Sequence, residues 1–509
     1  MNLNRRDLLR AAAAAGALGV AWPLSDRLSV AQAQEAAADL GARWDSAPFT
    51  LGVASGDPLP DSVVLWTRLA PQPLADTQPL PDTVEVEWLV AANRELTRIV
   101  ANGRTAAVAD VGHSVHVEVG GLEPGRRYYY RFRALGIDSR TGRTRTAPVG
   151  PVGRVRFASA NCQSFIDGYW AAHHAIARED LDFVVHLGDY VYEFGQAGGH
   201  PLRDHEGPEA FTLTDYRRRH ALYKGDPSLR DAHAAHPWFV TWDNHEVVGD
   251  YGQATPQRRL GAYQAWYEHM PIRDGHPTAP QVSRRRYWGD LLELTVLDLR
   301  QYRSAPNVPG ATILGAEQKS WLEQGVRQAR DSWHCWVNSI MLGQLRVPGG
   351  HRPYPDQWDG FADERKEVLT NVHTAGLEDL VVITGDWHSA FVQDIRPDFD
   401  DLTSPVIGTE FLAHSIASSG YGPAANAVLG PVLGLANPHL KYFEGNRYGY
   451  DLYDVTPDRW STHLRVIADR RDPVSPVSTL TTFHVDRGEP GSYEDRATAG
   501  SAAQYRRLW

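Results

Sequence analysis

The sequence predicts an α/β core preceded by a small all-β sandwich domain. Two observations predict this arrangement. Residues 49–149 hold short alternating or apolar runs separated by Gly, Pro and Asp turns, and residues 150–509 alternate short apolar runs with helical stretches. A Gly- and Pro-rich joint, Gly150-Pro151-Val152-Gly153, separates the two patterns. A chain of 509 residues is also long enough for two domains.

The first 33 residues have the pattern of a secretory leader. Arg5 and Arg6 precede a modest Ala/Gly/Leu/Val run, and Ala31-Gln32-Ala33 is a small-x-small cleavage pattern. This order indicates a twin-arginine signal peptide over 1–33 and a linker over 34–48, the alternative being an ordinary amphipathic helix. The apolar run is shorter than the ~18 residues that cross a bilayer, so we expect no permanent span. We expect the twin-arginine export machinery as a partner and a periplasmic or secreted location.

Composition narrows the class of protein further. The formal charge is -11, from 51 Lys+Arg and 62 Asp+Glu. Cleavage after Ala33 removes four Arg and two Asp, which leaves 47 basic and 60 acidic residues and a net charge of -13. Net acidity argues against a nucleic-acid partner. Two cysteines, Cys162 and Cys335, exclude a disulfide scaffold and a CxxC zinc site.

The segment 49–149 predicts a sandwich of short strands. Runs at 63–68, 84–89 and 116–119 alternate or are continuously apolar, and a Leu-Glu-Pro-Gly turn at 122–125 leads into the strongly β-prone run 128–132. Strands at this spacing are typical of a fibronectin-like or immunoglobulin-like sandwich. The segment holds no cluster of chemistry-bearing side chains, so we expect it to serve in packing or positioning.

The segment 150–509 predicts the α/β core with a C-terminal extension. The expected strands are 155–158, 183–187, 238–242, 292–299 and 381–384. The expected helices are 169–178, 216–223, 258–269, 316–330 and 363–373. The C-terminal aromatics (Tyr442, Phe443, Tyr448 and Tyr450) are expected to pack in the core rather than cover a site.

Polar side chains follow four of these strands. Ligands gather beyond the carboxyl ends of strands in α/β sheets, so we expect the four following segments to converge. They are Asn161-Cys162-Gln163, Gly188-Asp189-Tyr190-Val191-Tyr192-Glu193, Asp243-Asn244-His245-Glu246 and Gly385-Asp386-Trp387-His388.

These segments offer an unusual mixture of metal ligands. Carboxylates, an amide and imidazoles occur beside a phenol and a thiol, which suits a hard trivalent ion next to a divalent one and suits tetrahedral zinc poorly. Two adjacent metals can clamp a phosphoryl group and activate a water. Taken singly, each residue also has an ordinary structural explanation: a turn, a satisfied histidine or a buried thiol.

The four motifs together resemble the metallophosphoesterases, and more narrowly the PhoD-like alkaline phosphatases and phosphodiesterases. The likeness extends through Leu297 to Arg303, Trp358 to Phe361 and Asn437-Pro438-His439 to Gly449-Tyr450, and it includes the leader and the sandwich. It therefore implies a metallophosphoesterase-type α/β sandwich core over 150–509.

The resemblance also implies a ferric ion (Fe3+) and one or more calcium ions (Ca2+). The implied iron ligands are a thiolate, a phenolate, an imidazole and a carboxylate that bridges to calcium: Cys162, Tyr192, His388 and Asp189. Asn244 and Asp386 would face calcium. His245 and Asn244 would serve catalysis, with His245 acting as a proton donor to the leaving group or as an orienter of the phosphate.

The chain departs from the wider superfamily at two positions. No Asp-x-His follows the first strand, so Cys162 has to fill that position, and the superfamily's middle His has no counterpart near Asn338. Arg300 and Arg303 are candidates to reach substrate, the alternative being pairing with acidic neighbours. A Cys162–Cys335 disulfide is the rival to the iron–thiolate hypothesis; otherwise Cys335 is expected in the core.

We therefore expect an exported metal-dependent phosphoester hydrolase, an alkaline phosphatase in which metal-bound hydroxide or oxide attacks phosphorus in line. One alternative is a phosphodiesterase that acts on phospholipid, nucleotide or teichoic-acid-like polymers. An alternative of another class is a non-catalytic extracellular binding protein.

Overall fold

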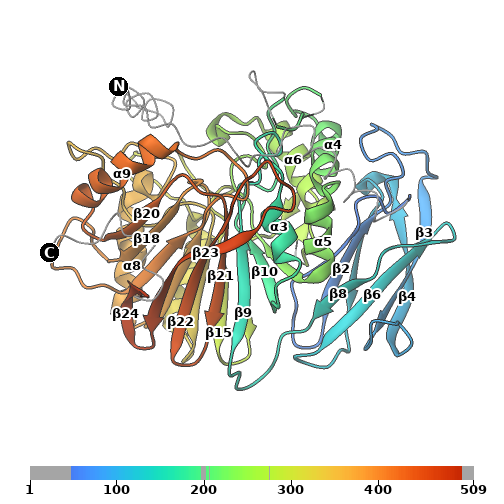
Figure 1. Cartoon of the computed structure of the whole chain (residues 1–509), viewed down its shortest axis with the longest axis horizontal. Coiled ribbons are helices and arrows are strands. Elements are labelled where there is room, and N and C mark those ends of the chain that lie inside the picture. The colour runs from blue at the N-terminus through green and yellow to red at the C-terminus, as the bar shows by residue number, and fades with distance from the viewer. Residues whose placement is uncertain (1–46, 196–201, 206, 274, 496–509) are drawn as a thin grey trace.

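Two large sheets lie face to face at the centre of the fold (Figure 1). The computed structural model describes residues 47–195, 202–205, 207–273 and 275–495. The predicted leader lies outside these residues. Within them, no helix combines the length and the apolar character needed to cross a bilayer.

The first sheet has ten strands and carries three of the four predicted motifs. Its centre is parallel: β9, β10 and β11 run in one direction, and β1 continues them in parallel with β11. In order across the sheet the strands are β24 (Glu489–Glu494), β23 (Val477–Asp486), β22 (Arg459–Ile467), β21 (Gly449–Val455), β9 (Val155–Ala160), β10 (Phe183–His186), β11 (Pro237–Val240), β1 (Val53–Gly56), β2 (Val63–Arg68) and β5 (Ser114–Val119).

The second sheet has seven strands and carries the fourth motif. Its centre, β15 to β19 through β16 and β17, is also parallel. In order the strands are β14 (Arg284–Trp288), β15 (Leu292–Val296), β16 (Trp333–Asn338), β17 (Leu380–Thr384), β19 (Gly408–Leu412), β18 (Ala390–Ile395) and β20 (Leu440–Glu444). A two-stranded ribbon, β12 (Gly275–His276) with β13 (Ala279–Pro280), stands apart.

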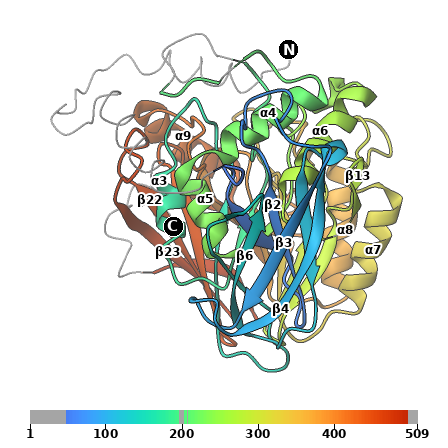
Figure 2. The ribbon, with the colours of Figure 1, turned by 90° about the vertical axis from the view of Figure 1, so that its right-hand side faces the viewer.

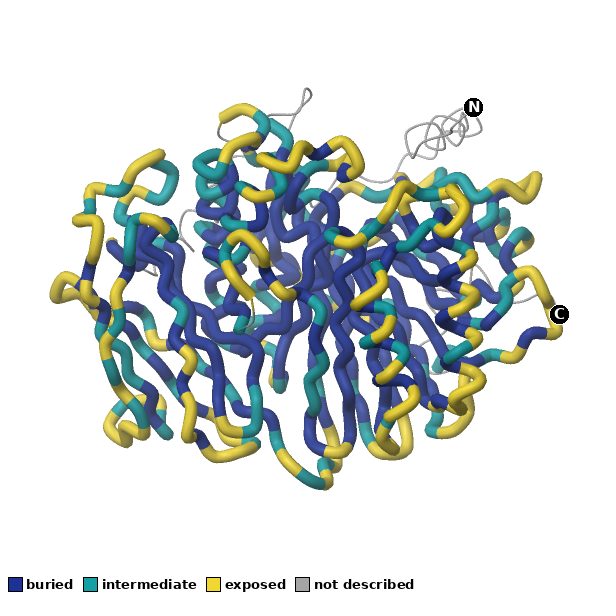
Figure 3. Tube along the Cα trace, turned by 180° about the vertical axis from the view of Figure 1, so that it is seen from behind, coloured by how far each residue is buried: buried dark blue, intermediate teal, exposed yellow. Residues whose placement is uncertain are grey.

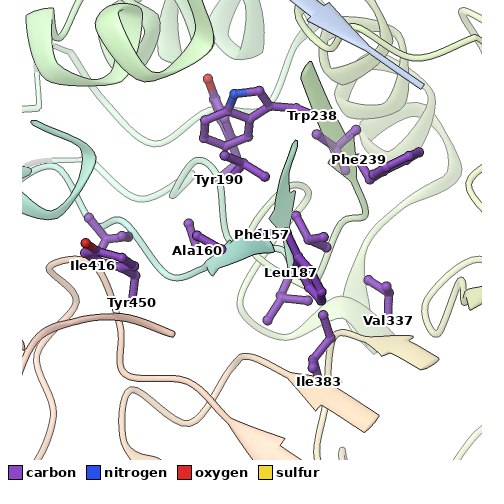
Figure 4. Close-up of a cluster of buried hydrophobic side chains, with 14 of the residues drawn as sticks. Phe157, Ala160, Leu187, Tyr190, Trp238, Phe239, Val337, Ile383, Ile416 and Tyr450 are labelled. Atoms are coloured by element: carbon purple, nitrogen blue, oxygen red, sulfur yellow. The ribbon is translucent and has the colours of Figure 1, made fainter. Parts of the chain in front are cut away.

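The alternation of side chains along the second sheet explains its two apolar faces. Val337 and Ile383 belong to the main core, where the close-up places them on strands facing Phe157 and Leu187 (Figure 4). Their neighbour Trp336 points the other way and packs with apolar residues of α7 (Gly315–Arg327) and α8 (Ala362–Thr374). Both faces are therefore covered, which is why these strands read as continuous apolar runs.

Helices cover the outer faces of the two sheets. In the view along the sandwich, α7 and α8 lie on one side and α3 (Ala171–Ile176) and α5 (Pro227–Ala235) on the other (Figure 2). The remaining helices are α4 (Leu213–Lys224), α6 (Pro256–His269) and α9 (Pro423–Ala436), with short 3-10 turns η1 (Ala109–Val111), η2 (Tyr251–Gln253) and η3 (Trp358–Phe361). Exposed residues concentrate at the rims and loops, and buried residues fill the strands between them (Figure 3).

The N-terminal segment forms an all-β sandwich, as predicted. One layer contains β4 (Ile99–Val108), β3 (Thr83–Ala91), β6 (Arg127–Ala134), β7 (Ile137–Asp138) and β8 (Gly142–Arg145). The facing layer is β1, β2 and β5, and the two share one apolar core. Because β1 pairs with β11, this second layer is also the end of the ten-stranded sheet, which the sequence did not predict.

Most predicted elements occur where expected. The run 63–68 is β2 and the run 381–384 lies within β17, while the helix expected over 258–269 is α6. The helix expected over 169–178 is shorter, because the backbone is helical only over α3. Tyr442, Phe443 and Tyr450 are buried and Tyr448 packs against the main core, as expected of packing residues.

Candidate metal centre

The four predicted motifs converge at the carboxyl ends of strands from both sheets. Cys162 follows β9, Asp189 follows β10 and Asn244 follows β11, all in the ten-stranded sheet. Asp386 and His388 follow β17 of the seven-stranded sheet. The candidate site is therefore built where the two sheets meet, and neither sheet supplies it alone.

One group of potential ligands joins a thiol, a carboxylate and an imidazole. Ligand atoms of Cys162, Asp189 and His388 all lie within 4.8 Å of one another, and all three residues are buried. The Cys162 Sγ atom is 3.5 Å from Asp189 Oδ2. The Tyr192 hydroxyl donates to the same Oδ2 atom at 2.9 Å and lies 3.1 Å from His388 Nε2. A phenol thus completes the group.

A second group consists of three carboxylates. Ligand atoms of Asp189, Asp243 and Asp386 also lie within 4.8 Å of one another, so Asp189 belongs to both groups. Asn244 lies in the same loop as Asp243; its Nδ2 donates to the Gly249 carbonyl at 2.8 Å. The Asn244 Oδ1 atom is buried and has no hydrogen-bond partner among the described residues.

The backbone is left-handed at four of the predicted site residues. The φ angle is 51° at Cys162, 54° at Asp189, 65° at Asp386 and 54° at His388. Positive φ is uncommon for residues with a Cβ atom, and such residues cluster at functional sites. The strands β9, β10 and β17 are thus followed by sharp turns that the surrounding structure has to hold.

Gly188 allows two of these turns to approach closely. Its φ is 106°, and a Cβ atom at this position would lie 2.6 Å from the Asp243 Cβ atom. No side chain larger than hydrogen fits there, so the glycine before Asp189 is required by the contact between the two loops.

Backbone and hydroxyl groups orient the imidazole and the phenol. His388 Nδ1 lies 2.9 Å from the Ser419 carbonyl. A carbonyl can only accept, so Nδ1 carries the hydrogen and Nε2 is the nitrogen left for a ligand role. Ser418 Oγ lies 2.7 Å from both the Tyr192 hydroxyl and the Cys162 carbonyl. The segment 418–419 therefore supports the thiol side of the centre.

Glu246 holds two of the loops together. Its carboxylate accepts the backbone N–H groups of Asp189 at 3.1 Å, Tyr190 at 2.7 Å and Asp243 at 2.8 Å. Burial and the charge of Asp189 raise the Glu246 pKa to about 7. Glu246 is next to His245 in the sequence, but the three hydrogen bonds of its carboxylate go to backbone N–H groups and not to the imidazole.

The partner of His245 is Glu193. His245 Nδ1 is 2.7 Å from Glu193 Oε2, and the other Glu193 oxygen accepts the Gly249 N–H at 2.8 Å. Burial lowers the His245 pKa, but the charges of Glu193 and Asp189 outweigh it and raise that pKa to about 9. The imidazole side chain is 23% exposed, whereas Glu193 is buried, so the proton-bearing ring faces outward.

The charges at the centre call for bound cations. Burial, with the carboxylates of Asp386 and Asp189, raises the Asp243 pKa well above its ordinary value even though Arg300 lowers it. Burial and the neighbouring Asp189 and Cys162 likewise raise the Tyr192 pKa. A metal ion reverses both effects, because it stabilises the ionised oxygen. The donor set therefore fits two cations that share Asp189.

Other predicted candidates lie beside the centre without joining it. Arg300 and Arg303 pair with acidic neighbours, which was the alternative to substrate contact: Arg300 with Asp243 and Asp356, and Arg303 with Asp356. The Asn338 amide contacts the Ile340 carbonyl and the Trp358 indole.

The two cysteines have separate roles in the fold. Both are free thiols, so the structure does not contain the Cys162–Cys335 disulfide that was the alternative. Cys335 lies on β16 within the main core, as expected, while Cys162 lies in the turn after β9.

Sequence reasoning missed two residues of the centre, Asp243 and Glu193. Both stand inside predicted motifs: Asp243 begins the segment after β11, and Glu193 directly follows Tyr192. The sequence signal that could have identified them is their position in a segment that follows a predicted strand. Their side-chain partners, Arg300 and His245, are more than 50 residues away along the chain, so no local pattern shows the pairing.

Family models match both parts of the chain. A model described as "PhoD-like phosphatase" matches residues 157–464, and one described as "PhoD-like phosphatase, N-terminal domain" matches residues 33–148. The first match spans all four motifs of the centre, and the second spans the sandwich.

Two relatives cover most of the chain. It is 39% identical over 484 residues to alkaline phosphatase D from Bacillus subtilis (strain 168), covering 88% of this chain and 82% of that protein. A solved structure described as "Structure of PhoD" superposes with a TM-score of 0.83 at 37% identity, covering 89% of this chain and 93% of the other.

Proposed function

The chain belongs to the PhoD-like phosphatase family and is a phosphoester hydrolase, and we propose that it is an exported enzyme that uses iron and calcium at the centre described above. The observation that carries the proposal is the double membership of Asp189. One carboxylate lies within ligand distance of a thiol–imidazole group and of a carboxylate group. A bridging carboxylate of this kind is what a two-metal centre requires.

The donor atoms support different ions at the two positions. Cys162, Tyr192 and His388 offer a thiolate, a phenolate and an imidazole, which suit Fe3+. Asp386 and Asn244 offer only oxygen as a ligand atom, which suits Ca2+. Asp189 would contribute to both. When bound, the ions supply Lewis acidity that lowers the pKa of water and neutralises charge on the phosphoryl group.

We infer that His245 is the residue at this centre that donates a proton to the leaving group. Its backbone N–H donates to Asp189 Oδ1 at 3.3 Å, and its ring centroid lies 4.3 Å from that of Tyr192. Glu193 binds Nδ1, so Nε2 of the partly exposed ring is the nitrogen that would donate a proton to the departing ester oxygen. Orientation of the phosphate by the same imidazolium is the alternative role.

Family membership and the assembled ligand set together favour an enzyme over a non-catalytic binding protein. Whether the enzyme prefers phosphomonoesters or phosphodiesters depends on the residues that contact the substrate, which the metal ligands do not determine. Rates on p-nitrophenyl phosphate and bis(p-nitrophenyl) phosphate measure it directly, and phospholipid or teichoic-acid-like polymers are the diesters to test next.

The test of the metal proposal combines elemental analysis with activity. Protein exported by its native host is expected to contain iron and calcium and to lose hydrolysis on chelation. Asp189→Ala is expected to abolish hydrolysis with the fold retained, while Asp401→Ala, at an exposed surface position, is the matched control. Full activity in folded Asp189→Ala protein, or active protein without either metal, would contradict the proposal.

Export is proposed from the sequence of residues 1–33 alone. Arg5→Lys with Arg6→Lys keeps the charge of the leader but removes its paired arginines. We expect this variant to accumulate inside the cell with its leader attached, whereas the native sequence yields mature protein outside the cytoplasm. Equal export of both forms would contradict the use of the twin-arginine machinery.

A further inference from the structure

Ser418 lies beside the Tyr192 hydroxyl but is not itself a proposed iron ligand. The Tyr192 oxygen is 2.9 Å from Asp189 Oδ2, 3.1 Å from His388 Nε2 and 2.7 Å from Ser418 Oγ. The contact with Ser418 is the shortest of these three. Ser418 is 1% exposed, so bulk water does not compete for its hydroxyl.

The Ser418 hydroxyl has one hydrogen and two nearby acceptors for it. The Ser164 backbone N–H donates to Ser418 Oγ at 3.0 Å and so occupies one acceptor position of this oxygen. The hydroxyl hydrogen can therefore point to the Cys162 carbonyl or to the Tyr192 oxygen, each 2.7 Å away. The choice depends on whether Tyr192 carries a hydrogen of its own.

The Cys162 carbonyl does not depend on this hydroxyl for a hydrogen bond. It also accepts the backbone N–H of Ser418 at 3.1 Å, so it stays paired when the hydroxyl turns away. A buried Tyr192 phenolate differs, because it carries a charge and has no hydrogen to donate. A hydrogen bond to such an ionised oxygen is about twice as strong as one to a neutral acceptor.

The chain around Ser418 fixes the position of its oxygen. Ser415 Oγ donates to the Ser418 carbonyl at 2.7 Å. On the other side, the backbone N–H and the hydroxyl of Ser419 both donate to the Asp167 carboxylate, at 3.2 and 3.0 Å. These contacts involve none of the proposed metal ligands, so the segment places the Ser418 hydroxyl beside Tyr192 independently of the metal.

We propose that Ser418 is a positioning residue that donates its hydroxyl hydrogen to the Tyr192 phenolate when iron is bound. This inference rests on the proposed function, in which Tyr192 is an iron ligand. A hydrogen bond to an anionic ligand weakens its donation of electrons to the metal. Ser418 therefore keeps the ferric ion more Lewis acidic and raises its reduction potential.

The first experiment measures the reduction potential of the bound iron in iron-loaded protein, by a redox titration that follows visible absorption. Ser418→Ala is expected to keep its iron, and reduction is expected to become about 10-fold less favourable, which is about 59 mV for a one-electron couple.

Ser415→Ala is the matched control, because it removes another buried hydroxyl of the same segment, whose hydrogen bond goes to a carbonyl. It is expected to keep the native potential. An unchanged potential in iron-loaded Ser418→Ala protein, or the same shift in both variants, would overturn the inference.

A second measurement needs no variant and decides the case if Ser418→Ala does not fold or does not bind iron. It is neutron diffraction from crystals of iron-loaded native protein exchanged into D2O. Deuterium on Ser418 Oγ directed to the Tyr192 oxygen supports the inference, and deuterium directed to the Cys162 carbonyl overturns it. Active native protein without iron would instead refute the metal assignment in the proposed function, and the inference with it.

Discussion

The imidazole of His245 is hydrogen-bonded to Glu193, 52 residues earlier in the chain, through His245 Nδ1 and Glu193 Oε2 at 2.7 Å. Glu246, its immediate neighbour in the sequence, instead binds three backbone N–H groups. The pair joins the loop after β10 to the loop after β11. It gives the proposed proton donor an anionic partner that favours the protonated form.

Replacing Glu193 with Gln is expected to lower the His245 pKa below its value of about 9, because the neutral amide no longer stabilises imidazolium. Titration of the His245 ring by NMR in metal-free protein measures this shift. Hydrolysis of alkyl esters, whose leaving oxygen needs a proton, is expected to slow by about 100-fold, with aryl esters much less affected. Equal slowing of both substrates would argue for the phosphate-orienting role.

The two cysteines form a natural matched pair. Cys162→Ser is expected to lose the bound iron and its visible absorption. Its activity is expected to fall by more than about 100-fold, since removing a metal ligand costs more than removing a residue that only supports one. Cys335→Ser is expected to keep all three and to lose on the order of 1–3 kcal/mol of stability, because a hydroxyl replaces a thiol in the apolar core. Retention of iron in Cys162→Ser would remove the thiolate from the centre.

Stability is expected to fall in mild acid, and His439 contributes to this. Burial lowers its pKa from 6.5 to about 4, while its Nε2 lies 2.8 Å from the Gln344 carbonyl. The folded state therefore binds this proton less well than the unfolded state, so its contribution is complete above pH 6.5 and is lost as the pH falls toward 4. At pH 4.5 the loss is about 2–3 kcal/mol.

His439→Gln is the corresponding variant, because an amide can donate to the same carbonyl without titrating. Urea unfolding at pH 7.5 and 4.5 is expected to show a smaller loss of stability in the variant than in the native chain. An identical loss in both would exclude His439 as a contributor.

The junction of the sandwich with the core depends on a buried ion pair. Asp57 is fully buried, its Oδ1 accepts from Arg284 Nε at 2.8 Å, and its Oδ2 accepts the Arg273 N–H at 3.0 Å. Asp57→Ala is expected to cost about 3–5 kcal/mol, because the buried Arg284 charge loses its carboxylate counter-ion. Glu123→Ala, which removes an exposed pair with Arg126, is expected to cost less than about 1 kcal/mol. Denaturant unfolding compares the two.

Elements with strong local patterns could be predicted from the sequence. The run Val63–Arg68 contains two valines, a leucine and a tryptophan, and it forms β2 with the predicted bounds. The predicted convergence of loops also followed from a general property of parallel strands. The sequence could not show that Val53–Gly56 is a strand, because four residues with one valine carry little signal without their partner β11.

The sequence could predict which loops form the site, but it could not predict which side chains pair within it. Cys162, Asp189 and His388 each follow a recognisable strand, so their convergence could be expected. The pairing of Asp243 with Arg300 depends on how two loops from different sheets pack, and no local pattern encodes it. Side-chain partners of this kind emerge only from the assembled structure.

The parallel pairing of β1 with β11 has a consequence for how the chain is made. Ser55 and Pro237, which face each other in this pair, are 182 positions apart. The first strand of the described chain therefore has no partner on one side until β11 has left the ribosome. During synthesis the sandwich can bury its own apolar core early, but its attachment to the parallel strands of the ten-stranded sheet has to wait until β11 is made.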